Sequence, residues 1–171
     1  GEIYLDSQFT NKTWSQTVAG SVVTKKRRVL HVATHFQIDS NIHQSKLLMG
    51  DGSFYSAQEL AAEPGLSLAH VDLVTLSACE TIVRKKSDNA EFEGLGALFQ
   101  SKGAQAVLGS LWQVADGGTA ELMRQFYTAR GEKRAMSKAQ ALQQAQREMI
   151  QDGDWSHPFY WSGFVLMGNW L

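Results

Sequence analysis

The sequence is poor in several features that would indicate particular classes of protein. Its 171 residues include one cysteine and two prolines, and the formal net charge is −1. A single cysteine excludes an internal disulfide and fits a reducing compartment such as the cytoplasm. The small net charge gives no reason to expect contact with nucleic acid or an anionic membrane. No apolar run approaches the roughly 18 residues of a membrane span, so we expect no membrane contact.

Motifs for common cofactors are also missing. The segment GLGALF (94–99) lacks the third glycine of a dinucleotide-binding loop and does not directly follow a strand. There is no phosphate-loop GKS or GKT, and Gly109-Ser110 lacks the second glycine of a nucleophile elbow. Zinc bound by His31, His35 and Cys79 would need another cysteine or a paired glutamate at motif spacing, and neither is present. We therefore expect neither a cofactor nor a metal.

What the chain does contain is an alternation of strand and helix patterns, with 43% apolar residues. Strands are predicted at residues 2–5, 29–34, 72–81, 105–112 and 164–167. Helices are predicted after Thr10, after the capping box Ser56–Glu59, over 92–102, from Asp116 or Thr119 to Gly131, and from the capping box Ser137–Gln140 to near Gly153. This alternation predicts one α/β domain with a largely parallel sheet.

The segments between these elements give further expectations. Residues 46–55 predict a hairpin around Asp51-Gly52, whereas 36–44 look irregular and 83–91 look like an exposed loop. The strand over 29–34 is apolar enough to be buried on both faces. The last helix is expected to bury Leu142, Ala145, Met149 and Ile150. The basic run at residues 25–28 is interpreted as a solvated start of a strand, with a contact patch as the alternative.

Two strands end on residues that could carry chemistry. His35 follows the strand over 29–34, and Cys79 follows the apolar part of the strand over 72–81. Sites in open α/β sheets form beyond the carboxyl ends of the strands, so these two side chains are expected to meet. An imidazole beside a thiol favours the nucleophilic thiolate, which would suit acyl transfer. Backbone N–H groups near Cys79 or at the end of the His35 strand could form the oxyanion hole.

A structural interpretation stands beside this one. A lone cysteine on an apolar strand is often a buried core residue. His31 shares the His35 face of its strand, and we interpret it as a core histidine or as a residue that supports the site. His43, His70 and His157 receive no role.

In chain order, the segments VLHVATH, LLMGDGSFYSAQEL, VDLVTLSACET, GLGALFQSKGAQAVLGSLWQVAD and HPFYWSGFVLMGNWL resemble the CHAT domain. This family belongs to the caspase-like cysteine peptidases and is often fused to tetratricopeptide repeats in bacteria. The resemblance covers nearly the whole chain. It implies a caspase-like three-layer sandwich with a mainly parallel sheet, a small hairpin and helices on both faces.

The resemblance also implies roles for particular residues. The catalytic dyad falls on His35 and Cys79, and the oxyanion donors on the N–H groups of Phe36 and Cys79. Relatives usually have glycine where Phe36 stands. Relatives that cut after lysine or arginine carry an acid where Ser77 stands. SLWQVAD, with Trp112 and Asp116, corresponds to the floor of the pocket for the residue before the scissile bond.

The resemblance leads to one leading function and two further hypotheses. The leading function is a cysteine endopeptidase acting on a protein or peptide substrate, with a preference for a basic residue before the cut that rests on Asp116. The alternative is a catalytically impaired caspase-like interaction or signalling module, suggested by Phe36. The third hypothesis is self-cleavage within 83–91, against a plain solvated loop. The chain is also expected to lack the first strands of the domain, leaving a sheet edge for a partner: an upstream repeat domain or the N-terminal part of the same CHAT domain.

Overall fold

The computed structural model describes residues 3–19, 28–39, 41–77, 83–84, 92–132 and 136–171. Its centre is a sheet in the order β1-β5-β8-β9, formed by β1 (Arg28–Ala33), β5 (Val71–Ser77), β8 (Ala106–Ser110) and β9 (Phe164–Gly168). The first three strands are parallel, and β9 pairs with β8 in the antiparallel direction. The carboxyl ends of three neighbouring strands therefore lie along the same edge of the sheet.

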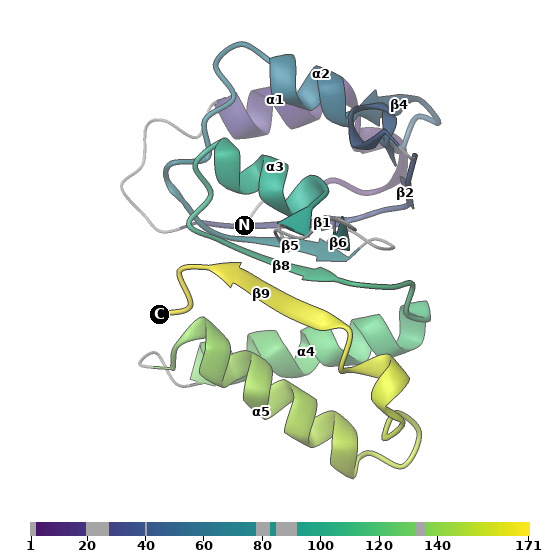
Figure 1. Ribbon diagram of the computed structural model, residues 1–171, viewed down its shortest axis with the longest axis vertical. Helices are drawn as coiled ribbons and strands as arrows, with labels where there is room; N and C mark the ends of the chain where they lie inside the picture. Colours follow the sequence, from purple (N-terminus) through teal and green to yellow (C-terminus); the bar gives the residue numbers. More distant parts are fainter. Residues whose placement is uncertain (1–2, 20–27, 40, 78–82, 85–91, 133–135) are drawn as a thin grey trace.

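Helices cover both faces of this sheet (Figure 1). On one face lie α1 (Asn11–Ala19), α2 (Ala57–Ala62) and α3 (Leu95–Ser101); on the other lie α4 (Asp116–Glu132) and α5 (Lys138–Gln151). A small antiparallel sheet consists of β2 (Phe36–Gln37), β3 (Lys46–Leu48) and β4 (Phe54–Ser56). Short 3-10 turns occupy Asp6–Gln8, Ile42–Gln44 and Pro158–Tyr160. The predicted α/β three-layer arrangement with a mainly parallel sheet is confirmed.

The predicted helix starts rest on local capping. The Thr10 side chain accepts a hydrogen bond from the Thr13 N–H at 3.2 Å, ahead of α1. Ser56 caps α2 and Ser137 caps α5, each in a reciprocal capping box with the residue three positions on. The hairpin turn contains Gly52 at φ 82°, a conformation that glycine adopts without strain.

Four expectations about secondary structure were wrong. Residues 36–37 form β2 because they pair with β3, a tertiary contact that a local pattern does not reveal. Residues 92–93 form strand β7 (Phe92–Glu93), paired with β6 (Val83–Arg84), so α3 starts only at Leu95 and the predicted loop begins with a strand. Residues 3–5 form no strand. Residues 85–91 lie outside the described part of the chain, as do 25–27 of the basic run.

Strand β5 is buried from Val71 to Leu76 and divides the core into two clusters. Val74 and Leu76 face the cluster under α1–α3, while Leu73 faces the cluster under α4 and α5. The expectation that the neighbouring strand β1 is buried on both faces was wrong. Its Val32 is buried, but Val29 on the opposite face is 48% exposed. Among the described strands, β1 lies at an edge of the sheet, and Val29 and His31 on its face toward α4 are exposed.

A buried ionic cluster holds the amino end of β5. Asp72, 3% exposed, pairs with the Lys138 Nζ at 3.0 Å and with the Arg130 Nη2 at 3.3 Å. Burial alone would raise the pKa of Asp72, but hydrogen bonds and charges from Lys138 and Arg130 outweigh it and lower that pKa. Lys138 also donates to the Leu171 carbonyl at 2.5 Å. The cluster thus ties β5, α4, α5 and the end of the chain together.

The same arrangement corrects the predicted buried face of α5. Leu142, Ala145 and Met149 are buried as expected, but Ile150 is 48% exposed. Lys138 and Ala141 are buried in addition, because the first turn of α5 faces Asp72.

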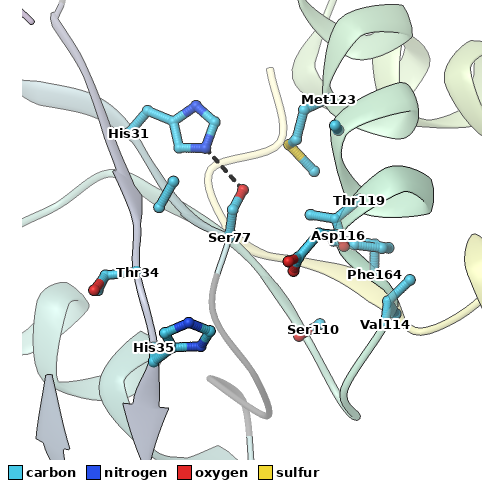
Figure 2. A pocket seen from close by; sticks show the side chains of 12 residues that line it. His31, Thr34, His35, Ser77, Ser110, Val114, Asp116, Thr119, Met123 and Phe164 are labelled. Atoms are coloured by element: carbon cyan, nitrogen blue, oxygen red, sulfur yellow. Dashed lines mark hydrogen bonds between the residues drawn. The ribbon is translucent and has the colours of Figure 1, made fainter. Parts of the chain in front are cut away.

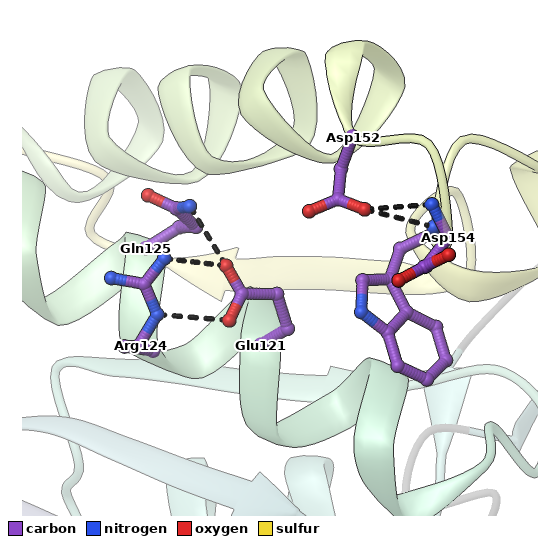
Figure 3. Close-up of polar contacts among 6 residues, drawn as sticks. Glu121, Arg124, Gln125, Asp152 and Asp154 are labelled. Atoms are coloured by element: carbon purple, nitrogen blue, oxygen red, sulfur yellow. Dashed lines mark hydrogen bonds and ion pairs between the residues drawn. The ribbon is translucent and has the colours of Figure 1, made fainter.

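Polar contacts on the outer side of α4 and α5 are of a different kind (Figure 3). The exposed Arg124 pairs with Glu121 at 2.6 Å, and the Gln125 side chain donates to the same carboxylate at 2.8 Å. Asp152 accepts hydrogen bonds from the N–H groups of Asp154 and Trp155 just after α5. These are surface pairs and a helix-ending turn, and neither is buried.

Candidate active site

A cavity of about 380 Å³ opens where β1, β5 and β8 end and α4 begins (Figure 2). It lies on the face of the sheet that α4 covers, beside the open face of β1. The lining residues come from five elements and the segments that follow them: His31, Ala33, Thr34, His35, Ser77, Ser110, Val114, Asp116, Thr119, Ala120, Met123 and Phe164. The position beyond strand carboxyl ends is the one expected for a site in this class of fold.

His35, the predicted catalytic histidine, lies just beyond β1 and lines the cavity with an exposed side chain. Cys79, its predicted partner, lies outside the described residues. The last described residue before it is Ser77, which ends β5 opposite Ala33 of β1 and lines the same cavity. The dyad therefore stays a prediction, with one member at the cavity.

His31 lies within β1, four residues before His35, and is not a core residue. Its Nε2 is 2.7 Å from the Ser77 Oγ, and its ring lies 5.6 Å from that of Tyr127 on α4. Desolvation by these neighbours lowers the pKa of His31, although the residue is exposed at the cavity, and this favours the neutral imidazole. Of the two interpretations given to His31, the core histidine was wrong, and its bond to Ser77 fits a supporting residue.

Phe36 points its ring away from the cavity. The ring is 6% exposed and belongs to the core cluster that includes Leu47. Phe36 lies opposite Leu47, and the Leu48 N–H donates to the His35 carbonyl at 2.9 Å. In an antiparallel ladder this makes Phe36–Leu47 the pair without mutual hydrogen bonds, so the Phe36 N–H points away from β3. The phenylalanine therefore keeps its N–H out of the ladder and does not fill the cavity.

Asp116 is the first residue of α4 and lines the cavity, with its carboxylate on the wall opposite His31 (Figure 2). A carboxylate is favourable there because helix N-termini carry partial positive charge. The C-terminal aromatic residues fix this end of α4. A Cβ on Gly118 would lie 2.9 Å from the Tyr160 ring, so the close approach requires glycine.

The structure does not bring Trp112 to the described lining of the cavity. Its indole N–H donates to the Phe159 carbonyl at 3.0 Å, and the two rings stack with centroids 6.3 Å apart. Gly163 packs against the same indole, where a Cβ would come within 2.6 Å. Trp112 thus joins the segment after β8 to the C-terminal aromatic residues, and a contact with substrate stays a prediction.

Comparison with known proteins agrees with the sequence resemblance. The CHAT domain family matches residues 2–169. The chain belongs to the CHAT domain family. Membership confirms the expected relation to caspase-like cysteine peptidases.

Two further comparisons accompany the family match. The chain is similar to a chain in the crystal structure of the Saccharomyces cerevisiae separase–securin complex, with 16% identity and a TM-score of 0.42. That similarity covers 59% of this chain and 8% of the other, so this chain spans a small part of its length. No curated protein matches.

Sequence reasoning missed several residues that line the cavity of this CHAT domain. Thr119, Ala120 and Met123 lie on the same face of α4 as Asp116, at spacings of three, four and seven residues. Once Asp116 was assigned to the pocket, this helical spacing could have identified them. Ser110 and Phe164 come from paired positions of β8 and β9, and their contribution depends on the antiparallel register.

The described residues of the CHAT domain contain no group of three or more histidine, cysteine, aspartate or glutamate side chains placed to hold a metal ion. Among the helices in the described ranges, none is long and apolar enough to cross a membrane.

Proposed function

We propose that this CHAT domain is a cysteine endopeptidase that uses a dyad of His35 and Cys79. One observation carries the proposal: His35 faces a cavity that Ser77 also lines, and Cys79 follows Ser77 by two residues. Two Cα–Cα steps of about 3.8 Å limit how far Cys79 can lie from that cavity. Family membership supports the same assignment.

In the proposed reaction, the Cys79 thiolate attacks the carbonyl carbon of the scissile peptide bond. His35 stabilises the thiolate as an imidazolium and then gives its proton to the leaving amine. Backbone N–H groups of Phe36 and Cys79 stabilise the oxyanion. Water then attacks the acyl-enzyme, with His35 as general base, and releases the second product.

The proposed substrate is a protein or peptide with a basic residue before the cut. Asp116 supports this preference because it is the one carboxylate in the described lining of the cavity. Ser77 contributes a hydroxyl that is already hydrogen-bonded to His31. Trp112, which is bonded to Phe159, is proposed to contact the substrate farther from the scissile bond.

Turnover of a peptide library by three single variants tests the proposal. Cys79→Ala and His35→Ala should each abolish cleavage, while His70→Ala, a change at an exposed histidine away from the cavity, should leave it intact. Cleavage retained by Cys79→Ala would sink the proposal. A library preference for acidic or apolar residues before the cut would reject the basic specificity alone.

The alternative, an impaired interaction module, was suggested by the phenylalanine after the dyad histidine. The Phe36 ring is packed in the core, which removes ring blockage as a reason for impairment. Faster alkylation of Cys79 than of free cysteine by a peptide electrophile would argue against the alternative.

Two regulatory proposals remain. The edge strand β1 is the proposed docking place for an upstream repeat domain or for an N-terminal part of the same CHAT domain. Self-cleavage is proposed within 83–91, a range that begins with β6 and ends just before β7. An intact mass after incubation with activators would discount it.

A further inference from the structure

Three titratable side chains line the described part of the cavity: His31, His35 and Asp116. The other lining residues are apolar or carry hydroxyl groups. Among the described lining residues, the charge therefore depends on the two histidines and a single carboxylate. His31 and Asp116 come from opposite walls, one from β1 and one from α4 (Figure 2).

Two contacts position the exposed His31 side chain at the cavity. Its Nε2 bonds to Ser77 at 2.7 Å, and the Tyr127 ring lies 5.6 Å from its own. Tyr127 is in turn held by its hydroxyl, which donates to the Thr75 Oγ1 at 2.8 Å. A charge gained by His31 would therefore stay in the cavity.

We propose that His31, anchored on Ser77, determines specificity by setting the charge of the cavity, so that a cationic substrate side chain is admitted only while His31 is neutral. This inference rests on the proposed peptidase function and extends it to the regulation of substrate choice. With His31 neutral, the Asp116 carboxylate gives the cavity a negative charge that attracts a cation. A proton on His31 cancels that charge and adds a positive group on the facing wall.

The described side chains around His31 are neutral or already paired. Tyr127 faces it from α4, and burial raises the pKa of that phenol, so it stays neutral. Arg130, one turn farther along α4, is paired with Asp72. From β5, Thr75 and Ser77 contribute hydroxyl groups only. His35 and Cys79 form the proposed dyad, and any effect of pH on the dyad must be separated by the design of the experiment.

Two peptides that differ only before the scissile bond separate it. One carries arginine and the other citrulline, its uncharged isostere, so a loss of dyad competence lowers both rates alike, and comparison with His31→Gln isolates the part of the pH dependence that His31 contributes. The ratio of kcat/KM for arginine over citrulline should fall about tenfold between about pH 7.5 and pH 5, the order of effect expected from one added unit charge in a partly screened site. In His31→Gln, which can still bond to Ser77, the ratio should stay constant.

Binding of agmatine, a guanidinium compound without a peptide bond, gives a second readout that needs no turnover. Its affinity, measured by NMR titration, should weaken about tenfold over the same pH range in the native chain and stay constant in His31→Gln. A constant ratio in the native chain, an equal pH dependence in His31→Gln, or no agmatine binding at neutral pH would overturn the inference. Cleavage with a constant ratio would reject the inference and leave the peptidase proposal standing. Binding of agmatine that depends on pH, without any cleavage, would reject the peptidase proposal and leave the role of His31 in cation binding.

Discussion

The polar groups at the two ends of strand β5 lie in different surroundings. At the amino end, Asp72 is buried and bonded to two cations, so its charge serves only to hold four segments together. At the carboxyl end, Ser77 lines a cavity together with His31 and Asp116. Both ends sit on one continuous buried strand. On this strand, the charge at the amino end is paired within the core, while the polar groups at the carboxyl end line a cavity.

The largest effect is expected at the amino end. Asp72→Asn leaves Lys138 buried, and Arg130 partly buried, without their carboxylate, which should lower the free energy of unfolding by about 3 kcal/mol or more. Denaturant unfolding measures this loss. Arg124→Ala is the control, since it removes an exposed ion pair and should leave stability nearly unchanged. Equal effects of the two changes would contradict the comparison.

Acid should abolish the contribution of the amino end. The pKa of Asp72 is lowered in the folded chain, so its stabilisation is complete above the ordinary aspartate pKa and is lost as the pH falls through the folded value. The stability difference between the native chain and Asp72→Asn should therefore shrink in acid. Unfolding curves recorded across the acid range test this, and a pH-independent difference would show that Asp72 does not act through its charge.

A smaller effect is expected from the packing of Gly163 against Trp112, just beyond the carboxyl end of β8. Gly163→Ala places a Cβ against the clamped Trp112 indole and should cost about 1–3 kcal/mol. Gly153→Ala is the matched control, because no atom lies within 4 Å of the added Cβ. Thermal unfolding of both variants makes the comparison. Equal melting temperatures would contradict this expectation, because they would mean that the Trp112 indole moves aside without a loss of stability.

The smallest effect on stability is expected at the cavity. Asp116→Asn removes a carboxylate at a helix N-terminus, which should change the free energy of unfolding by no more than about 1 kcal/mol. Cleavage of arginine peptides should nevertheless fall more than cleavage of citrulline peptides. Unfolding and kinetic measurements on the same variant separate the two. A loss of stability as large as that of Asp72→Asn would remove the contrast between the two ends.

The parts of the fold that could be predicted are those encoded by neighbouring residues. The capping serines Ser56 and Ser137 and the Asp51-Gly52 turn act within a few positions of the chain, and each was found where expected. The pairings of β2 and β7, two residues each, depend on partners elsewhere and left no local pattern.

The candidate site divides in the same way. The strand end predicted His35, and the family resemblance predicted Ser77 and Asp116; all three line the cavity. Trp112 lies away from the described lining because its partners, Phe159 and Gly163, come from a distant segment. Lys138 was not among the residues expected on the buried face of α5, and only the packing of α5 on β5 places it beside Asp72.

The most direct test of the central claim is the rate at which iodoacetamide alkylates Cys79 as a function of pH. The chain has a single cysteine, so the reaction reports on that thiol alone. A dyad predicts a thiol pKa well below the ordinary value of about 8.5 in the native chain and a return toward that value in His35→Ala. The same pH profile in both proteins would contradict a dyad of His35 and Cys79.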